Sequence, residues 1–143
     1  MTVDSRLLDF VATRNRGVLA TLKRDGRPQL STIGFSYDAE QRLFRVSVTA
    51  DRAKTRNAER DPRVTLHVNS DDYWTWAAVD GTADLSPVAS GPHDDTVEEL
   101  VAHYRAVSGK EHPDWDGYRA ALVTERRQVL RFTAEHTYGR IAD

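Results

Sequence analysis

A cluster of basic and polar residues at positions 51–57 is the most distinctive local feature of the sequence. The run Asp51-Arg52-Ala53-Lys54-Thr55-Arg56-Asn57 places cations, a hydroxyl and an amide in the first turns of a predicted short helix. A helix start has unpaired backbone N–H groups and the positive end of the helix dipole, so it attracts phosphate or carboxylate groups. Cations are unfavourable there unless a bound anion offsets their repulsion. The cluster therefore indicates an anion site, and the alternative is a solvated helix face with ion pairs to Glu59 and Asp61.

The predicted strand before this cluster supplies a polar surface. Ser47 and Thr49 share one face of that strand, since side chains alternate along a strand, and the chain then leads directly into the cluster. A planar ring lying over the strand could form hydrogen bonds there while its phosphate tail reached Arg52 and Lys54. The two segments together favour a ligand that combines a flat ring with an anionic tail.

A neighbouring predicted strand offers further small and polar groups. These residues are Gln29, Ser31, Thr32 and Gly34. Such side chains would let a flat ligand approach the backbone closely. The alternative interpretation is that they are ordinary outward-facing strand residues.

Two tryptophans are candidate ring contacts. Trp74 and Trp76 alternate on a predicted fifth strand, so both face one side while Tyr73 and Thr75 face the other. Aromatic walls suit stacking on a heterocycle, although paired tryptophans on one sheet face are also typical of a core or a subunit interface. Trp74 is therefore a candidate ligand residue with a structural alternative.

Several kinds of chemistry find no support in the sequence. Cysteine is absent, which excludes disulfides, thiolate metal sites and cysteine nucleophiles. The five histidines have no metal-binding spacing, so no metal site is expected. The glycine-rich nucleotide motifs and the Gly-x-Ser-x-Gly elbow are missing as well. Redox chemistry would need a bound cofactor, and no side chain is assigned as catalytic.

Charge and hydropathy indicate a cytoplasmic protein. The formal net charge is −2, with 20 basic and 22 acidic residues, so nucleic acid and membrane surfaces are not expected partners. The amino terminus lacks the basic and then apolar pattern of a secretory signal, and no stretch has membrane-spanning length. The expected partner is a small-molecule substrate.

Hydrophobic spacing and turn signals predict the elements that position these residues. Helices are predicted from Asp4 or Ser5 to between Asn15 and Gly17, over about 52–60 with an acidic cap, over about 95–107, and over about 115–122. Strands are predicted over 17–23, 28–37, 42–49, 63–69, 73–86 and 127–141. Six antiparallel strands suit a closed or nearly closed barrel, because closure pairs the exposed edges. The predicted class is therefore mainly β with α (α+β), a six-stranded antiparallel barrel with peripheral helices.

Four segments resemble the pyridoxamine-phosphate-oxidase-like split-barrel flavoproteins and, within them, the actinobacterial F420-dependent reductases. They are GVLATLKRDGRPQLS, RVSVTADRAKTRNAERDPRVTLHV, DDYWTWAAVDGTADLS and DDTVEELVAHYRAVSGKEHPDWDGYRAALVTERR. They cover nearly the whole chain in the right order, and RAKTRN followed by RDPR is the most specific part. The resemblance implies a split β-barrel of the FMN-binding type, with residues 1–143 as a single cofactor-binding domain.

The resemblance also implies a homodimer whose cofactor sites lie at the subunit interface. The cofactor phosphate would meet Arg52, Lys54 and Asn57, and the ring would lie along residues 31–33 and 47–49. An aromatic residue matching Trp74 would approach from the facing subunit. The predicted cofactor contacts are Gln29, Ser31, Thr32, Ile33, Ser47, Val48, Thr49, Arg52, Ala53, Lys54, Thr55, Asn57 and Trp74.

The implied activity is that of an F420H2-dependent reductase, which transfers hydride from a reduced deazaflavin to a small unsaturated or heteroaromatic acceptor. Two alternatives stay open. One is an FMN-dependent oxidase or flavin reductase of the same fold, and the other is a protein that binds or stores F420 without turnover. Pyridoxamine phosphate chemistry is not expected, because the basic carboxy-terminal segment of those oxidases is not found in this sequence.

Overall fold

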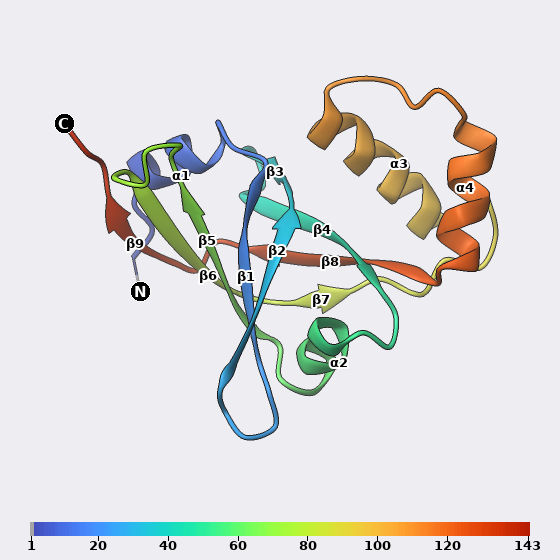
Figure 1. Cartoon of the computed structure of the whole chain (residues 1–143), viewed down its shortest axis with the longest axis horizontal. Helices are drawn as coiled ribbons and strands as arrows, with labels where there is room; N and C mark the ends of the chain where they lie inside the picture. The colour runs from blue at the N-terminus through green and yellow to red at the C-terminus, as the bar shows by residue number, and fades with distance from the viewer. Residues whose placement is uncertain (1) are drawn as a thin grey trace.

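The computed structural model describes residues 2–143, and in that part of the chain it contains two antiparallel sheets and four helices (Figure 1). The strands are β1 (Arg16–Leu22), β2 (Pro28–Gly34), β3 (Ser36–Asp38), β4 (Leu43–Thr49), β5 (Arg63–Asn69), β6 (Trp76–Thr82), β7 (Asp84–Leu85), β8 (Arg127–Thr133) and β9 (His136–Arg140). The helices are α1 (Ser5–Val11), α2 (Ala53–Arg60), α3 (Asp95–Ser108) and α4 (Trp115–Thr124). None of these helices is long and apolar enough to cross a membrane.

The mixed α+β class with antiparallel sheets is confirmed, but the six-strand count is wrong. One sheet has the order β2-β1-β5-β6-β9 and the other the order β3-β4-β8-β7. Three of the predicted long strands are interrupted, at Phe35, at Ala83 and at residues 134–135, and each continues in the other sheet. Six predicted segments thus become nine strands in two open sheets rather than a clearly closed six-stranded barrel.

The sheets approach each other closely where these strands change sheet. A Cβ atom on Gly81 of β6 would lie 2.7 Å from the backbone oxygen of Thr133 and from the ring of Phe132, both in β8. Phe35, which stands between β2 and β3, is fully buried. A buried aromatic residue and a close glycine contact therefore fix the bends that a strand pattern does not reveal.

Three predicted boundaries are also corrected. The first helix ends at Val11, because the next turns tighten to i, i+3 bonds such as Arg14 N–H to the Val11 carbonyl. Strand β6 begins at Trp76, so Trp74 lies in a turn, where its N–H donates to Asp72 Oδ1 at 3.1 Å. The N-cap of α2 is Arg52, which makes no side-chain capping bond, rather than an acidic residue.

The main core lies between the two sheets. On β4, Phe44, Val46 and Val48 are buried, and the Phe44 ring stacks on Phe132 with centroids 4.9 Å apart. Because side chains alternate, Ser47 and Thr49 are left on the opposite face of the strand, as the sequence predicts. A second cluster packs α3 and α4 on the outer face of β8 and consists of Ala89, Val97, Leu100, Val101, Leu122 and Val129.

A charged network and a buried histidine hold α3 on the sheet. Glu99 of α3 accepts from Nε of Arg45 and from Nε and Nη2 of Arg131, each at 2.7 Å. Burial alone would raise the pKa of Glu99, but the bonds from Arg131 and Arg45 outweigh it and lower that pKa. His103, one turn further along α3, is buried with Nδ1 2.8 Å from Ser36 Oγ. Burial, helped by Arg45 and opposed by Glu99, lowers the pKa of His103 to about 4.

We predict that His103 makes the fold sensitive to mild acid. Because its pKa is depressed in the folded state, its contribution to stability is complete above the unfolded value of about 6.5 and is lost as the pH falls toward 4. The free energy of unfolding should therefore drop by up to about 1.4 kcal/mol per pH unit in this range. Urea unfolding at about pH 7 and pH 5 measures this loss.

The matched variant is His103→Gln, which keeps a polar side chain that does not titrate. It should be less stable than the natural protein near neutral pH but should lose less stability between the two pH values. Equal losses in both proteins would show that His103 is not responsible.

Candidate functional site

A groove of about 430 Å³ lies where β2, β4, β8 and the start of α2 meet. The residues that line it are Gln29, Ser31, Ser47, Val48, Thr49, Arg52, Ala53, Lys54 and Arg127. None of these lining residues, all within the described chain, is acidic. Strands β2 and β4 thus contribute hydroxyl and amide groups, and the starts of α2 and β8 contribute cations. The lining is suited to a molecule with a polar body and a negative end.

Three cations converge on this groove without a carboxylate between them. Arg127 joins Arg52 and Lys54 because β8 pairs with β4 in the register that sets Thr49 opposite Arg127. The pKa of Lys54 is lowered, first by burial and then by the positive charges of Arg127 and Arg52. Like charges that disfavour one another in this way are stabilised by a bound anion.

The backbone N–H groups at the start of α2 add to the positive charge that the three cations bring to the groove. Thr55 is buried and donates its Oγ1 hydrogen to the carbonyl of Thr49 at 2.8 Å, which fixes the helix onto the end of β4. Arg52 caps the helix with its backbone only, so no side chain occupies the first N–H groups of α2. The helix start and its neighbouring cations therefore face the same groove.

Most of the predicted cofactor contacts line this groove, and they come from three segments. From β2 they are Gln29 and Ser31, from β4 they are Ser47, Val48 and Thr49, and from the α2 start they are Arg52, Ala53 and Lys54. Their role as cofactor contacts stays a prediction. What the structure adds is that these separate segments form one surface.

The remaining predicted residues do not line the groove. Ile33 is buried in the core, and Thr32 lies on the opposite face of β2 from Ser31 and is exposed. Thr55 supports the groove from below, as described above. Asn57 is buried and donates Nδ2 to Thr21 Oγ1 at 3.1 Å. Trp74 is 66% exposed and lies beside the carboxy-terminal residues 140–143.

Arg127 is the groove residue that the sequence analysis missed. It follows Arg126 at the start of a strand far along the chain, and only the β4–β8 pairing brings it to Thr49. Its Nε and Nη2 donate to Glu125 Oε1 at 3.0 and 2.9 Å. The sequence shows a run of charged residues before the last predicted strand, but nothing in that run indicates which strand this last strand pairs with.

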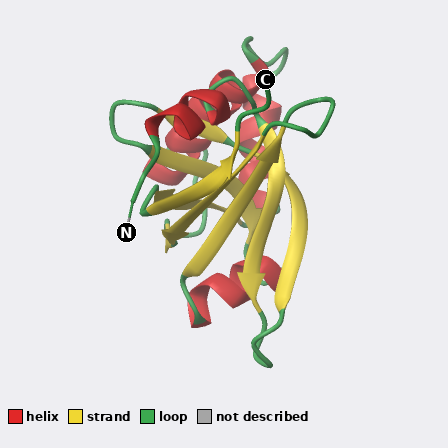
Figure 2. Cartoon of the chain, turned by 90° about the vertical axis from the view of Figure 1, so that its left-hand side faces the viewer, coloured by secondary structure: helices red, strands yellow, loops and turns green. Residues whose placement is uncertain are grey.

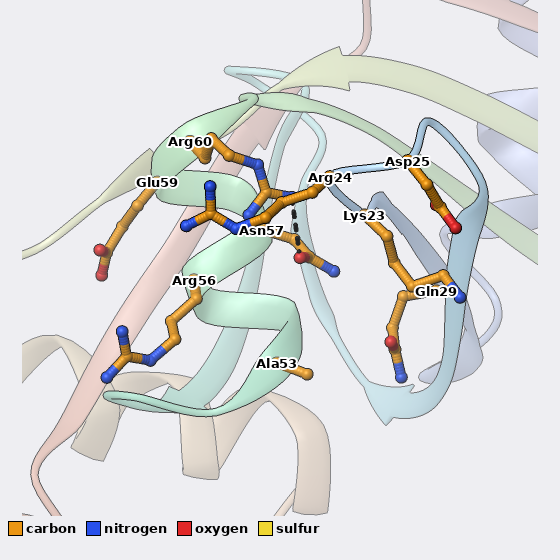
Figure 3. Close-up of a pocket in the computed structure, with 9 residues that line it drawn as sticks. All are labelled: Lys23, Arg24, Asp25, Gln29, Ala53, Arg56, Asn57, Glu59 and Arg60. Carbon is orange, nitrogen blue, oxygen red and sulfur yellow. Dashed lines mark hydrogen bonds between the residues drawn. The ribbon is translucent and has the colours of Figure 1, made fainter.

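A second, basic recess of about 700 Å³ lies between the β1–β2 turn and α2 (Figure 3). Its lining residues are Lys23, Arg24, Asp25, Gln29, Ala53, Arg56, Asn57, Glu59 and Arg60. The recess shares Gln29 and Ala53 with the groove, so the two hollows are neighbours. Arg60 donates Nη2 to Asn57 Oδ1 at 3.0 Å, drawn as a dashed line in Figure 3, and to the Leu22 carbonyl at 2.7 Å. Positive charge therefore continues past the groove along α2.

The residues that the structure describes include no group of three or more His, Asp or Glu side chains placed to hold a metal ion. The chemistry that this part of the chain offers is anion binding and hydrogen bonding to a flat polar ligand.

Comparisons with known proteins match the fold and the sequence pattern. The sequence profile described as pyridoxamine 5'-phosphate oxidase matches residues 3–140. The chain is 30% identical over 132 residues to the F420H(2)-dependent biliverdin reductase of Mycobacterium tuberculosis (strain CDC 1551 / Oshkosh), covering 92% of this chain and 84% of that protein.

Two solved structures share the architecture. A conserved hypothetical protein from Mycobacterium tuberculosis superposes with a TM-score of 0.72 at 22% identity, covering 97% of this chain and 84% of the other. A protein described as an F420 reductase superposes with a TM-score of 0.67 at 22% identity, covering 95% of this chain and 98% of the other. At this identity the structural likeness shows the fold. Together with the sequence matches it confirms the resemblance found in the sequence, and the chain belongs to the pyridoxamine 5'-phosphate oxidase family.

Proposed function

We propose that this protein is an oxidoreductase that binds coenzyme F420 in the groove and, with its reduced form, reduces a small unsaturated or heteroaromatic acceptor. The observation that carries the proposal is the convergence of Arg52, Lys54 and Arg127 beside polar strand residues, with no acidic residue in the described lining. The pKa of Lys54 is lowered first by burial and then by the positive charges of Arg127 and Arg52, which agrees with this placement of cations. The similarity to an F420H(2)-dependent reductase supports F420 as the cofactor.

The groove residues fit the two ends of such a cofactor. Arg52, Lys54 and Arg127, with the first N–H groups of α2, would hold its phosphate. Ser31, Ser47 and Thr49 would form hydrogen bonds to the ring, and the backbone around Val48 would support it. When bound in its reduced form, the deazaflavin supplies a hydride. The chain's own contribution is to bind and orient, and we assign no side chain as proton donor.

The basic recess favours F420 over FMN. FMN ends at its phosphate, whereas F420 continues beyond its phosphate into a chain that carries further carboxylates. Lys23 and Arg24 of the recess lie beyond Gln29 and Ala53, the residues that the recess shares with the groove. The longer anionic tail of F420 could form ion pairs with these cations, whereas the phosphate of FMN would not reach them. The recess therefore supports a cofactor with several negative charges.

The acceptor is proposed only as a chemical class. The curated relative is named for biliverdin, a conjugated heteroaromatic pigment, so biliverdin is the first acceptor to test. The FMN-dependent alternative and the binding or storage alternative remain the competing functions. The relative affinities for F420 and FMN distinguish the proposed function from the FMN-dependent alternative. Turnover of an acceptor distinguishes it from the binding or storage alternative.

We also propose that the protein is a homodimer, as the family resemblance implies, with cofactor sites at the interface. In Figure 2 the strands of the larger sheet lie toward the viewer, with α3 and α4 behind them. Leu30 on β2 is 64% exposed and Tyr138 on β9 is 48% exposed on this outer face. Gln29 and Ser31 line the groove from the opposite face of β2, and because β2 is the edge strand of its sheet, a partner that covered Leu30 and extended around this edge would reach the groove.

The proposed function predicts that the purified protein binds F420 more tightly than FMN and oxidises F420H2 when biliverdin or another conjugated acceptor is supplied. Fluorescence titrations with both cofactors and absorbance assays of F420H2 oxidation measure these outcomes. Comparable or tighter binding of FMN would favour the FMN-dependent alternative. Tight F420 binding without turnover of a broad acceptor panel would favour the storage alternative.

A double variant tests the recess within the same titrations. Lys23→Ala with Arg24→Ala should weaken F420 binding by about tenfold, because two charge-assisted contacts are lost, and should leave FMN binding unchanged. Arg6→Ala with Arg105→Ala removes the same charge at exposed positions on α1 and α3 and is the matched control. Equal losses for both cofactors would assign the effect to overall charge.

The lowered pKa of Lys54 predicts a pH dependence of cofactor binding. Its pKa is lowered in the free protein, so F420 affinity should fall as the pH rises through that lowered value and the ammonium loses its proton. Lys54→Arg should keep its affinity over this range, since a guanidinium stays charged, and Lys54→Met should weaken binding about ten- to a hundredfold at neutral pH. Titrations across the alkaline range decide this. If F420 affinity depended on pH in the same way in the natural protein and in Lys54→Arg, Lys54 would not be part of the anion site.

Leu30→Asp should convert the proposed dimer to monomers, because two charges would be buried at a symmetric contact. It should also weaken F420 binding if the partner borders the groove. Ala120→Asp, at an exposed position in the middle of α4, is the control of equal charge. Sedimentation velocity measures the assembly, and a natural protein that sediments as a monomer would contradict the dimer.

A further inference from the structure

We infer that Asp51 is a positioning residue of the groove, which ties the loop that carries Arg52 to the loop that leads into Arg127 at the start of β8. This inference rests on the proposed function, because it concerns how the anion site is kept in shape. Asp51 does not line the groove and is not its helix cap. Its carboxylate instead joins three parts of the chain.

The contacts of Asp51 cross from one loop to another. Its Oδ2 accepts a hydrogen bond from Arg126 Nη1 in the α4–β8 loop. Its Oδ1 accepts from Arg56 Nη2 on α2 at 3.3 Å, and its backbone carbonyl accepts from Arg56 Nε at the same distance. One carboxylate therefore holds the loop before α2, the helix itself and the loop before β8.

The tied residues are the direct neighbours of groove cations. Arg52 follows Asp51, and Arg127 follows Arg126. The ladder between β4 and β8 ends at the pair of Thr49 and Arg127, and one backbone bond continues it, from the Ala50 N–H to the Arg126 carbonyl at 2.9 Å. Beyond this bond, the Asp51 carboxylate is the contact that links the two loops through side chains.

The loops need such a link because both carry positive charge. Arg52, Arg56, Arg126 and Arg127 lie on adjacent segments, and their repulsion would favour separation of the loops. Arg127 is paired with Glu125, and the single carboxylate of Asp51 is shared by Arg56 and Arg126, which reduces but does not cancel their positive charge. With those two arginines engaged by Asp51, Arg52 and Lys54 are left to face the groove.

The backbone explains why aspartate suits this position. Asp51 has a φ of 70° and Arg126 a φ of 55°, so both loops turn through the left-handed region. Asparagine, aspartate and glycine tolerate that conformation better than other residues. Among these three only aspartate also carries a charge, so position 51 combines a backbone requirement with an electrostatic one.

Two physical roles for Asp51 predict opposite results. If Asp51 were only a negative charge near the site, its removal would strengthen the attraction for an anion. If it positions the cations, its removal weakens cofactor binding even though the local charge becomes more positive. The sign of the change in affinity therefore distinguishes the two roles.

The experiment measures F420 affinity of the natural protein, Asp51→Asn and Asp51→Gly at one moderate salt concentration. Both substitutions keep the left-handed turn accessible and remove the charge. We expect F420 affinity to fall about three- to tenfold in both variants, a size consistent with the loss of exposed ion pairs. Backbone hydrogen exchange at Ala50 should become faster in the variants, because the loops separate more often.

The control is Glu111→Gln, which removes one charge from an exposed ion pair with Arg105 on α3. It should change neither F420 affinity nor exchange at Ala50. If the natural protein binds F420 and Asp51→Asn binds it equally or more tightly, the inference about Asp51 is wrong but the proposed function still stands. Absence of F420 binding by the natural protein would overturn the proposed function and the inference with it.

Discussion

The repulsion among the cations at the junction of β4, α2 and β8 is the interaction on which the account of this protein depends. Arg52 and Lys54 come from the start of α2 and Arg127 comes from the start of β8, and their proximity is unfavourable in the absence of an anion. The fold compensates on the far side of the loops, where Asp51 engages Arg56 and Arg126. Within the groove Arg127 is paired with Glu125, while Arg52 and Lys54 are the cations that remain to attract an anion.

The two-sheet architecture makes this junction possible. Alternation along β4 buries Phe44, Val46 and Val48 between the sheets and leaves Ser47 and Thr49 free on the other face. Ser31 of β2 lies close to that free face, since both strands contribute to the groove. The strands therefore supply the polar side chains of the groove, and the starts of α2 and β8 supply the cations.

Short-range patterns predicted much of the site, and long-range pairing explains what they missed. The polar face of β4 and the basic run at residues 52–54 follow from local spacing, and both lie in the groove. Arg127 could not be found in this way, because it depends on which strand pairs with β4. The strand count failed for the same kind of reason, since the bends at Phe35 and Ala83 depend on contacts between sheets. Trp74 was misplaced because the turn made by Asp72 interrupts a segment of strand-like composition.

A crystal structure of the protein with F420 bound would show directly whether these cations hold the cofactor phosphate. We expect the cofactor phosphate to lie among Arg52, Lys54 and Arg127, at the start of α2, with the ring along β2 and β4. A phosphate bound elsewhere, with these three side chains directed into solvent, would contradict this expectation.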